Sequence, residues 1–216
     1  MFLVFAFVVE LVREALRMVS PTFRHWSHTG FGYFFFRMLH YAINMLTMLY
    51  FARINTKAAF LRTLGLAQPP SQYVWAGVTL TLVIRLAGYF MYAAGLAKGV
   101  TSSDAWGFRH TLGPERYLFL VPALLAPFCE ELYMRGFLYR AFRGSYSIQL
   151  STLLIVGVVA WTHSNQFHSW VAALDLSALT VLQCYLRERG NLRDCMASHL
   201  VFNFTWAAIV MSSSAR

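Results

Sequence analysis

Charge is scarce in this sequence, and acidic charge is the scarcest. Only 12% of the 216 residues are charged, with nine acidic side chains against eighteen basic ones, while 58% are hydrophobic. A soluble domain has about a quarter of its residues charged and about half apolar. The composition therefore excludes an ordinary soluble domain and indicates an integral membrane protein whose solvent is the lipid bilayer.

Lysine is nearly absent as well, because only Lys57 and Lys98 among the basic residues are lysines. The arginines are scattered among apolar segments and form no single patch. Arginine at the lipid head groups explains the formal net charge of +9 more simply than binding to nucleic acid, which we do not expect. The basic residues divide almost evenly between the two predicted sides, so they do not set the orientation.

Cysteine motifs and a signal-peptide pattern are not evident in the sequence either. The three cysteines show no CxxC or CxxH spacing, which excludes a zinc ribbon and a disulfide framework of paired cysteines. The run MFLVFAFVV lacks a basic region before it and a small-residue cleavage site after it, so we expect no cleaved signal peptide. Residues 1–29 instead predict an amphipathic helix at the membrane surface or against a partner, with charges on one stripe at Glu10, Arg13, Glu14 and Arg17.

The remainder, residues 30–216, predicts one multi-spanning, all-α membrane bundle. The sequence shows no internal repeat, which disfavours a transporter built from repeated, broken helices. About six segments are long and apolar enough to cross the membrane, although the fourth and fifth are short. They are Phe31–Phe51, Tyr73–Leu96, Tyr117–Leu138, Ile148–His163, Trp170–Leu186 and Met196–Met211.

Several polar side chains fall at membrane depth, where each needs a partner or a role. Arg85 and Asp175 each stand alone in the middle of a predicted span, so we expect them to pair across helices. A second group of polar residues favours a contact between helices over a catalytic role, because its members share one helical face at i, i+3, i+7 and i+10. Its members are Arg37, His40, Asn44 and Thr47.

The stretch APFCEELYMRGFLYR, residues 126–140, concentrates charge inside an apolar segment. Glu131 precedes Arg135 by four residues, the favoured spacing for an ion pair within a helix. Glu130 is rotated about 100° from Glu131 and has no such local partner. Pro127 lacks an N–H and should leave one helical carbonyl free nearby. These residues alone fit a structural ion-pair network and a reactive site equally well.

Two histidines favour the reactive site. His163 ends an apolar run, and His199 lies four residues before Asn203 on one face of the last predicted span. A carboxylate without a charged partner can take a proton from water, a histidine can relay it, and an amide can stabilise an oxyanion. Glu130, His163 and His199 could instead hold a divalent metal such as zinc with one open position. The residues leave both alternatives open.

The segments EELYMR and HLVFN match the motifs EExxxR and HxxxN, and the sequence therefore resembles the CPBP intramembrane proteases. That family includes type II CAAX prenyl endopeptidases and bacteriocin self-immunity proteins. The resemblance covers residues 118–208, including the turn YLRERGNL. It implies that Glu130 is the catalytic glutamate, that Glu131 and Arg135 support it, and that His163, His199 and Asn203 complete the site.

Two features depart from the family. Val159 stands where the family usually has phenylalanine, four residues before the middle histidine, and the helix with Asp175 lacks the usual glycines. Depth raises a further question, because a rise of about 1.5 Å per residue puts His163 deeper than Glu130. The side chains of His163 and Glu130 can meet only if the helix that ends at His163 starts later, near Thr152, or is strongly tilted.

Together these observations predict an intramembrane endopeptidase that hydrolyses a peptide bond of a membrane-associated peptide or protein through a glutamate- and histidine-activated water. They place it as a multi-pass protein of a prokaryotic cell membrane. The alternative is a catalytically inactive family member that serves as a structural or accessory subunit of a larger membrane complex.

Overall fold

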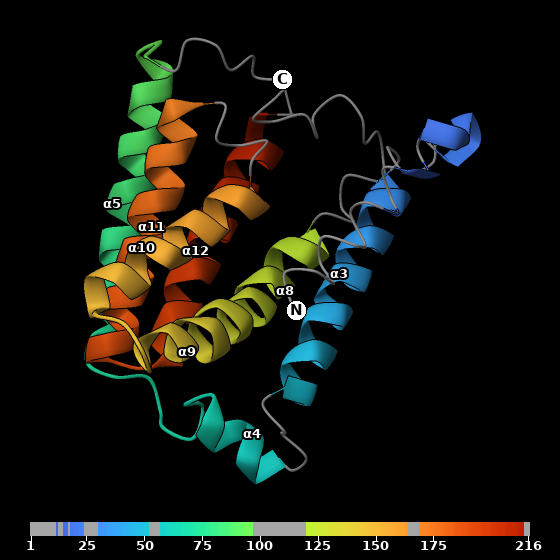
Figure 1. Ribbon diagram of the computed structural model, residues 1–216. Coiled ribbons are helices and arrows are strands. Elements are labelled where there is room, and N and C mark those ends of the chain that lie inside the picture. The colour runs from blue at the N-terminus through green and yellow to red at the C-terminus, as the bar shows by residue number, and fades with distance from the viewer. Residues whose placement is uncertain are drawn as a thin grey trace.

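Every element that the computed structural model describes is a helix (Figure 1). The described residues are 12, 15–16, 18–23, 30–51, 57–96, 120–163 and 169–213. The charged stripe predicted at Glu10 to Arg17 lies outside them, so the boundary at residue 30 stays a prediction. In chain order the elements are α3 (Gly30–Phe51), α4 (Lys57–Thr63), α5 (Val74–Ala93), α8 (Leu120–Glu131), the π-helix η2 (Leu132–Leu138), α9 (Tyr139–Arg143), α10 (Ile148–Thr162), α11 (Trp170–Arg189) and α12 (Leu192–Ser213).

The predicted all-α fold class is confirmed, and each predicted span corresponds to a helix or, for Tyr117–Leu138, to α8 followed by η2. The number of membrane crossings is a separate matter. Among the described helices, α5 is long and apolar enough to cross a bilayer over Val74–Met91, and α10 is a shorter apolar helix. The six crossings therefore stay a prediction, whereas the six helical segments are established.

Helix α5 exposes its apolar side chains, as a lipid-facing helix does. Trp75 is 74% exposed, Val83 56% and Phe90 64%. A continuous apolar surface of this kind is rare on a soluble monomer and marks contact with lipid or with another protein. The opposite face of α5 packs against α11 and α12, where the hydroxyls of Thr81 and Ser198 lie 2.6 Å apart.

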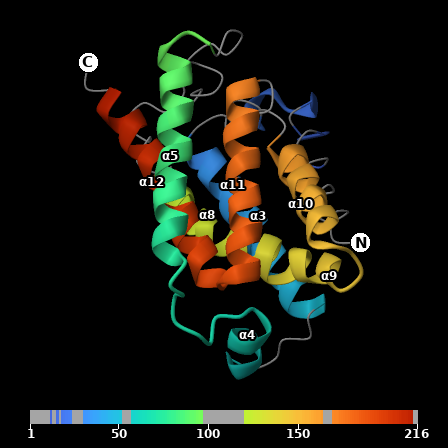
Figure 2. The same ribbon diagram turned by 90° about the vertical axis from the view of Figure 1, so that its left-hand side faces the viewer.

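Helix α12 organises the bundle, since it packs against α5, α8 and α11 (Figure 2). Its first turn is fixed by a reciprocal capping box. The side chain of Asn191 accepts hydrogen bonds from the backbone N–H groups of Arg193 (2.9 Å) and Asp194 (3.3 Å), and Asp194 accepts one from the N–H of Asn191 (3.0 Å). Asp194 also accepts a hydrogen bond from the backbone N–H of Ser71, which ties the start of α12 to the loop before α5.

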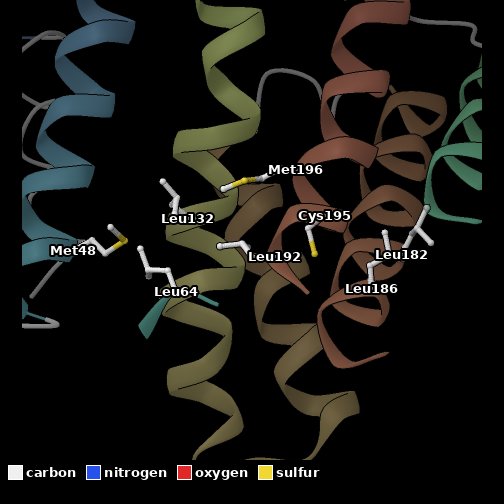
Figure 3. Close-up of a cluster of buried hydrophobic side chains, with 8 residues drawn as sticks. All are labelled: Met48, Leu64, Leu132, Leu182, Leu186, Leu192, Cys195 and Met196. Carbon is white, nitrogen blue, oxygen red and sulfur yellow. The ribbon is translucent and has the colours of Figure 1, made fainter. Parts of the chain in front are cut away.

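A buried apolar cluster joins α3, α4 and η2 to the ends of α11 and α12 (Figure 3). Met48, Leu64 and Leu192 are fully buried in it. Gly136 in η2 permits this approach, because a Cβ there would lie 3.2 Å from methyl groups of Leu64 and Leu192. The cluster holds α3, which lies outside the segment with the motifs, firmly against the helix that carries them.

Arg85 of α5 and Asp175 of α11 form the interhelical pair that their positions in the sequence predict. Nη1 of Arg85 donates to Oδ2 of Asp175 at 2.8 Å, and the guanidinium lies over the ring of Phe202, 4.3 Å from its centre. Gly88 makes room for the carboxylate, because a Cβ at that position would lie 2.6 Å from both of its oxygens. Asp175 thus occupies space that a glycine on the neighbouring helix provides.

We expect Arg85→Met to destabilise the folded protein by about 3 to 5 kcal/mol, because it leaves the buried Asp175 charge without a cation. Thermal or denaturant unfolding in detergent micelles measures the change. The matched variant Arg85→Met/Asp175→Leu removes both charges and should recover most of the lost stability. An equal loss in the single and double variants would show that the ion pair does not account for the effect.

Helix α10 begins at Ile148, where Ser147 caps it by accepting a hydrogen bond from the N–H of Leu150 at 3.2 Å. The later start near Thr152 is therefore wrong. The helix instead crosses α11 obliquely (Figure 1). This tilt is the second of the two geometries that could bring His163 toward the depth of Glu130.

Candidate active site

The proline in α8 sets the first feature of the site. Pro127 has no N–H to donate to the carbonyl of Ala123, four residues earlier. The side-chain Nδ2 of Asn203 on α12 donates to that carbonyl at 3.0 Å. Asn203 therefore commits one of its amide hydrogens to fixing α8, close to the turn that carries the two glutamates.

Directly after Glu131 the chain changes to the π-helical hydrogen bonding of η2, a rare geometry that is frequent at functional sites. Glu131 is completely buried, and its Oε1 accepts hydrogen bonds from Nη1 of Arg135 (3.0 Å) and from Nδ1 of His199 (2.7 Å). A carboxylate only accepts when ionised, so the hydrogen on His199 lies on Nδ1. The other ring nitrogen, Nε2, is then turned toward Glu130.

Glu130 has a different environment from its neighbour. Its Oε2 lies 3.9 Å from Nε2 of His199, beyond a direct hydrogen bond, and its Oε1 accepts a hydrogen bond from the hydroxyl of Tyr41 at 3.2 Å. The side chains of His163 and Arg37 also lie near enough to interact with this carboxylate electrostatically. The sequence motifs thus supply two histidines around Glu130, and α3 supplies a tyrosine and an arginine.

His163 is held at the end of α10. It is the C-cap residue, and its Nδ1 lies 3.1 Å from the carbonyl oxygen of Val159. A carbonyl can only accept, so this nitrogen carries the hydrogen and Nε2 has a free lone pair. Position 159 contacts the histidine through its backbone carbonyl, a contact that does not depend on which side chain stands there.

Tyr41 was missed in the sequence because its partner is 89 residues away. It is 6% exposed and lies one helical turn from Arg37 on the side of α3 that faces α8. A buried phenol needs a hydrogen-bond partner, which would have been a reason to include Tyr41 with the predicted polar face of α3. That face consequently borders the site, whereas the sequence favoured a simple interhelical contact.

The other members of the predicted face have local contacts. The hydroxyl of Thr47 donates to the carbonyl of Ile43 at 2.7 Å, and the ring of His40 lies edge-on to that of Tyr41, with centroids 6.3 Å apart. Asn44 is 9% exposed, and its side-chain oxygen has no hydrogen-bond partner among the described residues.

The alternative that Glu130, His163 and His199 hold a metal ion can be compared with the positions of their possible ligand atoms. Nδ1 of His199 is committed to Glu131, so Nε2 is its one possible ligand atom, and it lies 3.9 Å from Oε2 of Glu130. Over the described ranges no three His, Cys, Asp or Glu side chains are grouped as a metal site. A metal at Glu130, His163 and His199 therefore stays a prediction, and we derive no step through one.

The helices of the described residues, the exposed apolar surface of α5 and the partly buried Glu130 beside His199 are features expected of a membrane-embedded hydrolase. Residues 113–205 match the family model of the Rce1-like type II CAAX prenyl endopeptidases. This segment carries both motifs together with Glu130, His163 and His199, and its match to a family of CAAX proteases agrees with the predicted CPBP resemblance. Comparisons with curated proteins and with solved structures gave no match.

Proposed function

We propose that the protein is an intramembrane endopeptidase in which Glu130 activates a water molecule. The observation that carries this proposal is the position of His199, whose two ring nitrogens face Glu131 at 2.7 Å and Glu130 at 3.9 Å. One carboxylate fixes the ring, and the other stays available for chemistry.

In the proposed reaction a water molecule hydrogen-bonds to Glu130 and attacks the peptide carbonyl carbon while its proton moves to the carboxylate. The carbonyl π electrons move to oxygen and form a tetrahedral oxyanion. When the intermediate collapses, the C–N bond breaks, and the amine leaves with the proton that Glu130 had received. No bond between enzyme and substrate forms at any stage.

The histidines have separate roles in this scheme. The carboxylate of Glu131 fixes the ring of His199 through Nδ1, so that Nε2 faces Glu130 and can relay the proton from Glu130 to the leaving amine. His163 keeps a free lone pair on Nε2 and can hold the attacking water. Asn203 acts as a positioning residue, because it fixes the carbonyl that Pro127 leaves free in α8.

The substrate is a peptide or protein that reaches the site from the membrane, and the chain is a multi-pass protein of a prokaryotic cell membrane. The family match supports a peptide substrate, and the six apolar helical segments support several crossings. The alternative of an inactive accessory subunit is decided by whether purified protein cleaves a fluorogenic peptide in lipid nanodiscs. The assay uses a CAAX-type peptide with and without a prenyl group, and no cleavage of either form at any tested pH would contradict the proposal.

Tyr41→Phe should lower kcat by roughly tenfold while the free energy of unfolding changes by no more than about 1.5 kcal/mol, the net value of one hydrogen bond. The variant keeps the ring in the core and removes only the hydroxyl that orients Glu130. Steady-state kinetics in nanodiscs, with unfolding in parallel, separate the two effects. A conserved kcat, or a loss of kcat matched by a large loss of stability, would show that Tyr41 does not position the base.

A further inference from the structure

A hollow of about 700 Å³ lies at one end of the bundle, away from the candidate active site. It forms where α4, α9 and the turn between α11 and α12 meet, and α4 lies beyond the ends of the other helices in both views (Figures 1 and 2). Its charged lining residues are Arg62, Arg140, Arg143, Arg187 and Glu188. The proteolytic mechanism uses none of them.

Positive charge dominates the lining that the structure describes. Four guanidinium groups from three helices stand against a single carboxylate, that of Glu188. This carboxylate already accepts a hydrogen bond from Nε of Arg143 at 2.7 Å. The nearby acid Asp194 is fully buried and bonded to Ser71 and Asn191, so it does not offset the remaining charge in the hollow.

Two of the arginines are held in place before any ligand arrives. Arg187 donates through Nε to the carbonyl of Arg135 at 3.3 Å, and its guanidinium lies against Gly65, where a Cβ would be 3.1 Å away. Gly65 has a φ of +72°, a conformation that favours glycine. Arg143 donates a second hydrogen bond to the carbonyl of Tyr146 at 2.6 Å. Preorganised donors lose little side-chain entropy when a ligand binds.

The hollow lies at the expected depth of the lipid head groups. The loop residues Gly65 and Gln68 line it, and α5 begins its membrane-length apolar stretch at Val74, a few residues later. Trp75, at the start of that stretch, is 74% exposed, and tryptophan is enriched at the membrane–water boundary. An occupant can therefore reach the hollow from the head-group layer.

We propose that this hollow binds the phosphate group of an anionic membrane phospholipid. Planar guanidinium groups present paired donors that match phosphate oxygens, and a basic pocket between membrane helices is a typical head-group site. A soluble phosphate offers the same chemistry, and the experiment distinguishes the two sources. Binding would fix the depth of the bundle in the membrane, and it does not depend on the proposed proteolysis.

The test is lipid binding to the intact protein, measured by native mass spectrometry and by thermal unfolding in mild detergent. Phosphatidylglycerol should bind and raise Tm, whereas the zwitterionic phosphatidylcholine and inorganic phosphate should do so at least tenfold more weakly. Arg62→Gln/Arg140→Gln should weaken phosphatidylglycerol binding by about tenfold or more. Both side chains are exposed, so the core is untouched, and the single variant Arg62→Gln serves if the double variant does not fold.

Arg189→Gln is the matched control, because Arg189 is an exposed arginine in the last turn of α11 that does not line the hollow. It should leave phosphatidylglycerol binding unchanged. An equal loss in this control would reduce the effect to unspecific attraction by net charge and overturn the proposal. Equal binding of both lipids would also overturn it, and stronger stabilisation by inorganic phosphate would assign the hollow to a soluble phosphate compound.

Discussion

Glu130→Gln lowers kcat for peptide cleavage by roughly 10²- to 10⁴-fold in the expected result, because the amide cannot accept the proton of the attacking water. Glutamine keeps the size of the side chain and can still accept a hydrogen bond from Tyr41. The fold and the KM for the peptide should therefore change little. Kinetics of the purified variant in nanodiscs, together with its unfolding curve, measure both properties.

Cys129→Ala is the matched control for this variant, since it alters the preceding side chain on the same helix. Cys129 is a free, partly buried thiol with no place in the proposed reaction. Its variant should keep wild-type kcat. A loss of activity in Cys129→Ala with retention in Glu130→Gln would point to a nucleophilic thiol and reject the glutamate as base.

The second large effect concerns Arg135, which is 2% exposed and pairs with the fully buried Glu131. We expect Arg135→Met to destabilise the protein by about 3 to 5 kcal/mol, because it leaves a buried carboxylate without its cation. Activity should fall as well, since Glu131 also fixes the ring of His199. Unfolding in detergent and kcat at a temperature where the variant is folded measure the two losses.

The double variant Arg135→Met/Glu131→Gln separates stability from function. A neutral glutamine needs no cation, so much of the stability should return, but the carboxylate that holds Nδ1 of His199 is gone. We therefore expect kcat to stay low in the double variant. Full recovery of activity together with stability would mean that Glu131 and Arg135 only hold the helices together.

The sequence predicted much of the site because its signals are local. The four-residue spacing of Glu131 and Arg135 produces their ion pair, and Pro127 does leave a carbonyl that another group satisfies. The sequence predicts that Asn203 shares a helical face with His199. It does not predict the hydrogen bond from Asn203 to the Ala123 carbonyl, because that contact depends on how α12 packs against α8. Helical periodicity predicts on which face of its helix a residue lies, but it does not predict which residue of another helix it contacts.

Long-range contacts explain the other differences. Tyr41 reaches Glu130 from a helix outside the segment that matches the family, and no motif marks it. The start of α10 at Ile148 was correctly predicted. Its tilt could not be predicted, because it depends on how the helix packs against its neighbours. Local patterns therefore predicted the helices and the candidate reactive residues, and tertiary packing determined which residues meet.

The most direct test of the central claim is the fate of the peptide carbonyl during cleavage. The purified protein cleaves a peptide in nanodiscs, in water enriched in heavy oxygen and in the presence of hydroxylamine, and mass spectrometry identifies the N-terminal product. Direct attack by water predicts a carboxylic acid with one heavy oxygen and no hydroxamate. A peptide hydroxamate would reveal a covalent acyl-enzyme and contradict the role of Glu130 as the base that activates water.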